Sequence, residues 1–173
     1  MNITPTPILI CTQSFYSIGV QCDVLASIVS SAASAAYPSA NRAHYAPFIV
    51  HGAILVQTLF WYNGATVSGN VDIGLYSIDG TRLVSTGSTV QSGTSVAQSV
   101  AVTSFILPPG AYFFAISCDN TTATFMRSNA VAQISRLLGL ALQNTAFPLP
   151  ATATFAATGG YSPVMGLSTR SFV

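Results

Sequence analysis

Hydrophobic and polar residues alternate along the middle of the chain with the period of two that is typical of a half-buried β-strand. Val71, Ile73 and Leu75 alternate with smaller or more polar neighbours, and Asp79-Gly80 follows shortly after them. Because Asp-Gly between two such runs is a strong hairpin signal, we predict a returning strand over residues 83–88. A similar alternation of valine with alanine, serine and threonine predicts another strand over 96–103.

A turn signal follows that strand. In Leu107-Pro108-Pro109-Gly110, Pro109 presets φ for one central position, and Gly110 is expected to supply the positive φ of a type II turn. Residues 111–118 are apolar on both faces, as expected for a central strand, and further strands are expected over 53–62 and 123–127. Strands of this length and spacing predict an all-β fold: an antiparallel two-sheet sandwich that is jelly-roll-like.

The two ends of the chain carry weaker patterns. Asp23 could cap a short helix that stops before Pro38, although residues 30–34 fit a loop equally well, and Asn129 could cap a second helix. A final strand is expected over 163–169. We therefore expect an extended N-terminal arm for assembly over residues 1–42, a β-sandwich domain with a C-terminal tail over 43–173, and at most one or two short helices.

The chain carries very little charge, because it has no lysine and no glutamate, five arginines and four aspartates. Charged residues make up 5% of it, against about 25% in an ordinary soluble domain. Its net charge is +1 and its mean hydropathy is +0.57. Interspersed charge normally keeps a free monomer from associating, so we expect neighbouring subunits to cover much of this surface.

The same composition argues against two classes of partner. Nucleic-acid binding needs clustered lysine and arginine, whereas the five arginines here are scattered. A membrane-spanning helix needs about 20 consecutive apolar residues, and no run of the chain reaches that length. We expect no nucleic acid and no membrane among the partners.

Candidate catalytic groups are few. Asp72 and Asp79 are the only close pair of carboxylates, and we expect Asp72 to face solvent from its strand and Asp79 to serve the turn, rather than to act together as acid and base. His44 and His51 are expected in strands as interface or core residues.

The cysteines and the short sequence motifs also give no indication of catalysis. Three cysteines are an odd number, and we expect them to be small buried residues: Cys11, Cys22 and Cys118. No nucleotide, metal or nucleophilic-serine motif occurs. We predict no enzyme activity, with no catalytic residue, no cofactor and no metal.

The one candidate binding patch is aromatic. Trp61 and Tyr62 end a predicted strand beside the Asn63-Gly64 turn, and Tyr76 lies on the next strand. Such rings could stack on sugars or contact another subunit, although aromatic residues in strands more often fill the core. Trp61, Tyr62 and Tyr76 are therefore a candidate glycan or interface patch.

Four runs in the middle of the chain form a recognisable pattern: WYNGATVSGNVDIGLY at 61–76, DGTRLVSTGS at 79–88, LPPGAYF at 107–113 and NTTATF at 120–125. Together they resemble small virion structural proteins of tailed bacteriophages, which carry a β-sandwich or jelly-roll domain. The resemblance covers about residues 43–127 and, more loosely, 148–167. It implies a capsid decoration, head-fibre or tail-associated protein. It carries over no functional residues, because the framework and not a catalytic motif defines the group.

Two hypotheses follow. The first is a non-enzymatic subunit located in the virion, a homo-oligomer with a trimer favoured, which contacts other virion proteins such as the major capsid or tail proteins. In this hypothesis it is a decoration (cement) or head–tail accessory protein that stabilises the assembly. The alternative is a carbohydrate-recognition β-sandwich module of a phage fibre or of a secreted protein.

Overall fold

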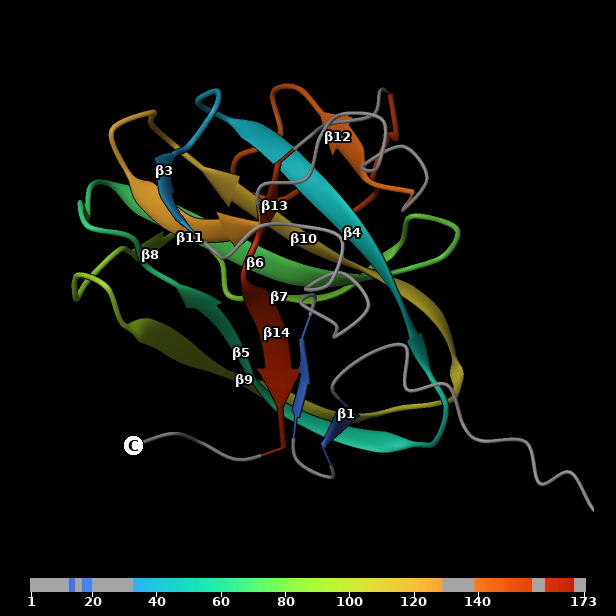
Figure 1. The fold of residues 1–173 in the computed structure, drawn as a ribbon. Coiled ribbons are helices and arrows are strands. Elements are labelled where there is room, and N and C mark those ends of the chain that lie inside the picture. Colours follow the sequence, from blue (N-terminus) through green and yellow to red (C-terminus); the bar gives the residue numbers. More distant parts are fainter. Residues whose placement is uncertain (1–12, 15–16, 20–32, 129–138, 157–160, 170–173) are drawn as a thin grey trace, which may run out of the picture.

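The computed structural model describes residues 13–14, 17–19, 33–128, 139–156 and 161–169, and every regular element in them is a β-strand (Figure 1). All strand pairs in this part of the chain are antiparallel, which confirms the predicted all-β sandwich-like fold. The β5 sheet has the order β1 (Gln13–Ser14), β2 (Ser17–Gly19), β14 (Met165–Ser168), β5 (Ile54–Tyr62), β9 (Ala97–Leu107). The β10 sheet has the order β12 (Ala141–Gln143), β4 (Arg42–Val50), β10 (Gly110–Cys118), β6 (Asn70–Ser77), β7 (Arg82–Ser85), and β8 (Thr89–Val90) also pairs with β6.

A third, small sheet lies at one end of the sandwich (Figure 1). It has the order β13 (Ser162–Pro163), β11 (Thr124–Ser128), β3 (Ala33–Ala36). Tyr37, which follows β3, is buried in the main core, where its hydroxyl donates to the carbonyl of Ile116 on β10 at 2.9 Å. The small sheet is thus joined to the sandwich by a core side chain.

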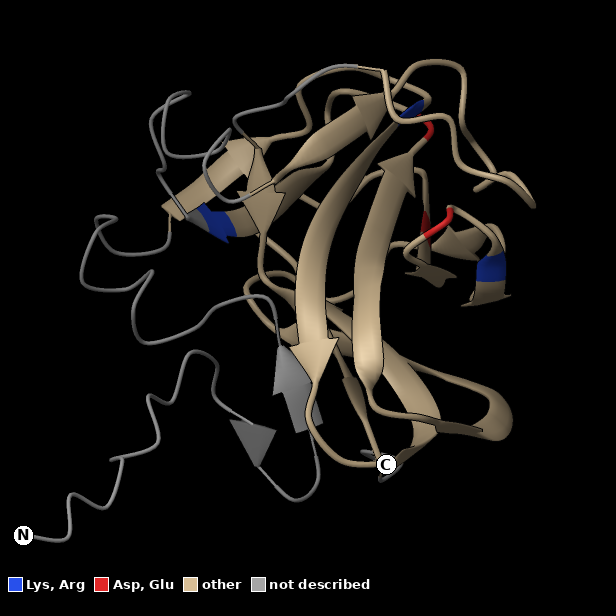
Figure 2. Ribbon diagram, turned by 90° about the vertical axis from the view of Figure 1, so that its right-hand side faces the viewer, with Lys and Arg blue, Asp and Glu red and all other residues tan. Residues whose placement is uncertain are grey.

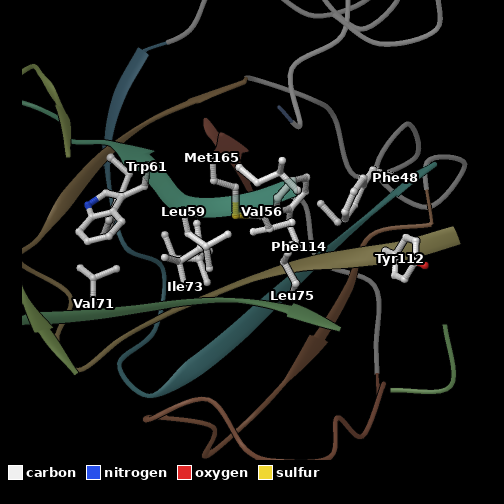
Figure 3. Close-up of a cluster of buried hydrophobic side chains, with 14 of the residues drawn as sticks. Phe48, Val56, Leu59, Trp61, Val71, Ile73, Leu75, Tyr112, Phe114 and Met165 are labelled. Carbon is white, nitrogen blue, oxygen red and sulfur yellow. The ribbon is translucent and has the colours of Figure 1, made fainter. Parts of the chain in front are cut away.

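The main core lies between the β5 and β10 sheets. Figure 3 shows Leu59 and Trp61 from β5 opposite Ile73 from β6, with Phe114 of β10 in the same cluster. Phe48 of β4 stacks on Phe114 with ring centroids 4.0 Å apart. The alternation seen in the sequence places these side chains on the inner faces, because successive side chains of a strand point to opposite sides.

Two connections carry the chain from one sheet to the other. Residues 51–53 join β4 to β5, and Pro108 and Pro109 join β9 to β10. Val50 pairs with Gly110, and Ile54 pairs with Leu107, so the two connections run side by side. The strand order β4-β10-β6 opposite β5-β9 is that of a two-sheet sandwich, and the jelly-roll connectivity stays a prediction.

The turn expectations have different outcomes. Gly80 has φ of 87° between β6 and β7, which confirms the predicted hairpin. Gly110 is not among the glycines with positive φ, so the predicted type II turn is wrong. Gly110 is instead the first residue of β10. The physical reason is that the two prolines cross between sheets, whereas a type II turn would fold β10 back beside β9.

The outer face of the β10 sheet is covered, which the sequence did not predict. Residues 144–156, here called the covering segment, pack on it through Leu149 and Ala153, against Tyr45 and Tyr76. Thr81 and Thr152 form a β-bridge, and the N–H of Ala153 donates to the carbonyl of Gly80 at 2.8 Å. Both faces of β6 are therefore buried.

The ends also differ from expectation. Ala33–Ala36 forms β3, so the predicted first helix does not extend to Pro38, and the rest of it and the second helix lie outside the described residues. The strand expected over 163–169 is present as β13 and β14. Within the expected arm over residues 1–42, β3 pairs with β11, and the division of the chain at residue 42 stays a prediction. Residues 1–12 of the expected arm lie outside the described residues.

Candidate functional site

The structure does not bring Trp61, Tyr62 and Tyr76 together on one surface. Trp61 is fully buried in the main core, with its indole N–H donating to Oδ1 of Asn63 at 2.7 Å. Tyr76 is fully buried on the opposite side of the β10 sheet, where its hydroxyl donates to the carbonyl of Pro150 at 2.6 Å. Tyr62 alone is partly exposed, and its hydroxyl donates to the carbonyl of Ser95 at 2.9 Å. Of these three rings, only that of Tyr62 is accessible to a sugar.

The buried side-chain amide of Asn63 organises the loops at the end of the sandwich where β5 ends. Oδ1 of the fully buried Asn63 also accepts from Nε2 of Gln91 at 2.9 Å. Its Nδ2 donates to the carbonyls of Ser92 and Gly93 at 2.6 and 2.9 Å and to Oε1 of Gln98 at 3.1 Å. The Asn63-Gly64 pair was interpreted only as a turn, yet its amide fixes the loop between β8 and β9. These hydrogen bonds tie the loop between β8 and β9 to the residue that follows β5.

The two predicted carboxylates have separate roles. Asp79 is exposed in the hairpin, where the Ser77 hydroxyl and then the Thr81 N–H hold the pKa of its carboxyl below the usual range. The expectation that Asp72 faces solvent is wrong, because Asp72 is fully buried beneath the covering segment. Its Oδ2 accepts from the N–H of Leu149 at 2.9 Å, and its Oδ1 accepts from the Thr86 hydroxyl at 3.3 Å. Burial raises the pKa of Asp72 despite these donors.

The two histidines also separate. His44 lies on β4 and is only 4% exposed, with rings of Tyr37 and Tyr161 at 5.5 and 5.2 Å. Neither ring nitrogen has a hydrogen-bond partner. Burial, and secondarily the nearby Arg42 charge, lower the pKa of His44 to about 4. His51 is exposed in the connection after β4, so it is not in the strand where we expected it.

Other chemistry-bearing groups are scattered in the described part of the chain. Cys118 is a buried free thiol, as expected, and burial raises its pKa to about 11. Cys11 and Cys22 lie outside the described residues. Among the described residues, no group of three or more His, Cys, Asp or Glu side chains is arranged to hold a metal ion. Nor does any helix in this part of the chain meet the length and hydropathy needed to cross a membrane.

The strongest candidate surface is the end of the sandwich opposite the small sheet, here called the apolar end. It combines the two inter-sheet connections with the strand residues beside them. Leu55 and Ile106 are directly opposed on β5 and β9, and they are 42% and 69% exposed. Ile49 of β4 is 57% exposed and pairs with Ala111. The remaining exposed apolar residues of this end are Ala53, Pro108, Pro109 and Ala111.

Among the described residues that form the apolar end there is no aspartate, glutamate, lysine or arginine. No Asp, Glu, Lys or Arg occurs in residues 43–71 or 83–118, which supply this surface. In Figure 2 the blue and red residues, which belong to the described part of the chain, lie away from the lower part of the molecule, where the connections run. The described polar side chains here include the exposed His51 and Tyr112, whose hydroxyl donates to the carbonyl of Pro108 at 2.9 Å.

Because their neighbours along the strands are core residues, Ile49 faces outward from the β10 sheet, and Leu55 and Ile106 face outward from the β5 sheet. Exposed apolar residues of this kind gather around the two connections, where an interaction surface would be uncharged.

The sequence did not predict this surface, because strands were expected over 53–62, 96–103 and 111–118 and a turn over 107–110. The available signal was the absence of charge from residues 49–55 and 106–111. What the sequence lacked was the side-by-side course of the two connections. A comparison with protein-family models finds no match, and comparisons with curated proteins and with solved structures find none either. The function must therefore be argued from this chain's own surface and composition.

Proposed function

We propose that the protein is a non-enzymatic structural subunit of a bacteriophage particle, a capsid decoration or head–tail accessory protein that stabilises the particle through subunit contacts. The observation that carries the assembly role is the apolar end on a chain with only 5% charged residues. The phage assignment rests on the resemblance of residues 43–127 to small virion proteins.

The fold supplies what such a subunit needs. A subunit that binds only the assembled particle stabilises it by its own binding free energy. Rigid binding surfaces lose little entropy on association. Here the Asn63 amide network holds the loops of one end, and the paired connections hold the apolar end. Both ends of the sandwich are thereby presented in one conformation.

The sparse charge is also explained by this role. A free protein of low charge tends to associate and precipitate, whereas a subunit in an assembly has much of its surface covered. Exposed apolar side chains such as Ile106 then contribute burial on assembly, at about 25 cal/mol for each Å² removed from water. The composition thus lowers the solubility of the free chain and favours its association into an assembly.

The experiment that tests this proposal is quantitative mass spectrometry of particles purified by density gradient from the phage that encodes the chain. We expect the protein in the particles at a fixed copy number that repeated purification does not reduce. Absence from the particles, with the protein recovered in the lysate, would contradict the proposal.

A further inference from the structure

We infer that the contact between the small sheet and the sandwich is an acid-sensitive switch, in which protonation of His44 opens the small sheet away from the end of the core. The opening is a step separate from the unfolding of the β5 and β10 sheets. The inference does not depend on the proposed assembly role, because it concerns how the single chain responds to pH. It goes beyond an overall loss of stability in acid, since it names the part of the fold that gives way.

His44 lies where the small sheet meets the β10 sheet. It is two residues before Ala46 on β4, so its side chain points to the core side of the sheet, as that of Ala46 does. The rings over it come from the small sheet: Tyr37 follows β3, Tyr161 precedes β13, and their centroids lie 5.5 and 5.2 Å from the imidazole centroid. Phe125 of β11 packs on Tyr37 with ring centroids 5.5 Å apart. Each strand of the small sheet thus contributes an aromatic ring, on the strand or next to it, to this cluster.

The imidazole of His44 is buried without a hydrogen bond. The residue is 4% exposed, and neither ring nitrogen has a partner. The protonated ring has a second N–H donor and a full positive charge. Burying such a charge without an acceptor or water is strongly unfavourable. Protonation is therefore favoured only in a state that exposes the ring to water.

The charged and titratable groups around the imidazole do not offset a positive charge. On its own strand, Arg42 is itself a cation, and burial, followed by this charge, lowers the pKa of His44 to about 4. On the small-sheet side, burial raises the pKa values of Tyr37 and Tyr161, so both hydroxyls stay neutral in acid. Arg127 of β11 brings a further cation, with its guanidinium carbon 5.7 Å from the centroid of the Tyr161 ring. A protonated His44 would thus stand among cations and neutral rings.

The other elements packed here supply no anion among the described residues. The strand β12 has no titratable side chain, and β10 contributes the thiol of Cys118, whose pKa burial raises to about 11. The aspartates that the structure describes are engaged elsewhere: Asp72 beneath the covering segment, Asp79 in the hairpin, and Asp119 with the backbone and side-chain amides of Asn70. In the part of the chain that the structure describes, no carboxylate contributes to the pKa of the imidazole.

The small sheet is held together by short pairings. The strands β4 and β10 pair over nine residues, whereas β11 pairs with β3 over four residues and with β13 over two. Strands as short as these depend on packing for their stability. The packing of the small sheet on the core includes the rings over His44, so a charge at that position disrupts the contact on which these pairings depend. The β4–β10 pair has its own long ladder and should stay formed.

Hydrogen exchange of the full-length chain at pH 7 and pH 4.5 tests the switch, with rates corrected for the pH dependence of exchange in an unstructured peptide. We expect the protection of small-sheet amides, such as the Tyr37 N–H that donates to the Ala123 carbonyl at 2.8 Å, to fall by roughly 100-fold at pH 4.5. Amides in the middle of β10 should stay better protected than these at pH 4.5. Equal protection of the two groups would mean that the chain opens as one unit, and it would overturn the inference.

His44→Leu should abolish the acid response of the small sheet, because leucine carries no group to protonate. His51→Leu is the matched control, since His51 is exposed in the connection between β4 and β5, and it should respond to acid as the wild type does. An acid response of the small sheet that persists in His44→Leu would also overturn the inference.

Labelling of Cys118 tests the opening in the wild-type chain, without a substitution. Cys118 is buried in the main core near Tyr37 and Tyr161, whose pKa values it helps to raise, so opening the small sheet should expose its thiol. The probe is a dipyridyl disulfide, which reacts with thiols in acid, and peptide mass spectrometry identifies the modified cysteine. Relative to the urea-unfolded chain, Cys118 should react faster at pH 4.5 than at pH 7. A thiol that is no more reactive at pH 4.5 would contradict the opening.

Discussion

At the residue scale, the side chains that decide the local structure are buried polar groups that a hydrophobic pattern does not single out. Asn63 receives the Trp61 indole N–H and the Gln91 amide, and it donates to the loop between β8 and β9. His44 is buried without a partner for either ring nitrogen. Because burying a polar group is unfavourable unless it is hydrogen-bonded, these two positions should respond very differently to substitution.

Asn63→Ala should destabilise the chain by about 3 kcal/mol, because it leaves the buried Trp61 and Gln91 donors unpaired and opens a small cavity. Tyr62→Phe, at the neighbouring position, removes one partly exposed hydrogen bond to the carbonyl of Ser95. It should destabilise the chain by less than about 1 kcal/mol. Urea unfolding at pH 7 measures both. Equal losses for the two variants would show that Asn63 does not organise this end.

The imidazole of His44 should make the fold sensitive to acid. Its pKa is about 4 in the folded chain against 6.5 in the unfolded chain, so the unfolded chain binds the proton more tightly. Stability from this group is complete above pH 6.5 and is lost as the pH falls toward 4, by up to about 3 kcal/mol.

His44→Leu should remove that loss of stability. The measurement is the free energy of unfolding in urea at pH 7 and at pH 4.5, for the variant and for the wild type. The buried Asp72, whose pKa is raised, acts in the opposite direction, so the difference between the two proteins is the informative quantity. An identical drop in both proteins would mean that other groups account for the acid sensitivity.

At the element scale, the central strands followed from the alternation of residues, and the elements that cover them did not. The strand β6 and its hairpin turn were predicted because Val71, Ile73 and Leu75 have the right period and Asp79-Gly80 the right turn chemistry. Asp72 was expected to face solvent, but it is buried because Leu149, 77 residues away in sequence, covers it. A periodic pattern identifies a strand, but long-range packing decides what lies over its second face.

The candidate glycan or interface patch does not form one surface, for a related reason. Trp61, Tyr62 and Tyr76 are close in sequence, but successive strand residues point to opposite faces, and β5 and β6 belong to different sheets. Trp61 therefore enters the core, and Tyr76 lies beneath the covering segment. The same physical rule that predicted the strands separates the three rings.

The covering segment gives a test of its own. Asp72→Ala should release it, because the N–H of Leu149 loses its acceptor, at a cost of about 1 to 3 kcal/mol. Hydrogen exchange should then be faster at the Leu149 and Ala153 amides. Asp72→Asn keeps an acceptor oxygen and carries no charge to bury, so it should be much milder.

Asp79→Ala is the matched control for this change, since Asp79 is an exposed aspartate seven residues further along the same hairpin. It should leave exchange in the covering segment unaltered. If Asp72→Ala also left that exchange unaltered, the carboxylate would not be what holds the segment on the β10 sheet.

At the scale of the whole molecule, the two ends of the sandwich have different surfaces. One end carries the small sheet (Figure 1) and polar loops tied to Asn63. The other carries exposed apolar residues such as Leu55 and Ile106. Composition predicts that neighbouring subunits cover part of the surface, and the fold shows where the exposed apolar residues lie. The proposed assembly role predicts that this end, whose described residues include no acidic or strongly basic group, is buried in the particle.

The measurement that tests this account most directly is the copy number of the protein in gradient-purified particles, by mass spectrometry against isotope-labelled standard peptides. The account predicts a constant ratio to the major structural protein across preparations and through a high-salt wash, since the apolar contacts do not depend on charge. Absence of the protein, or a trace amount that the wash removes, would contradict it.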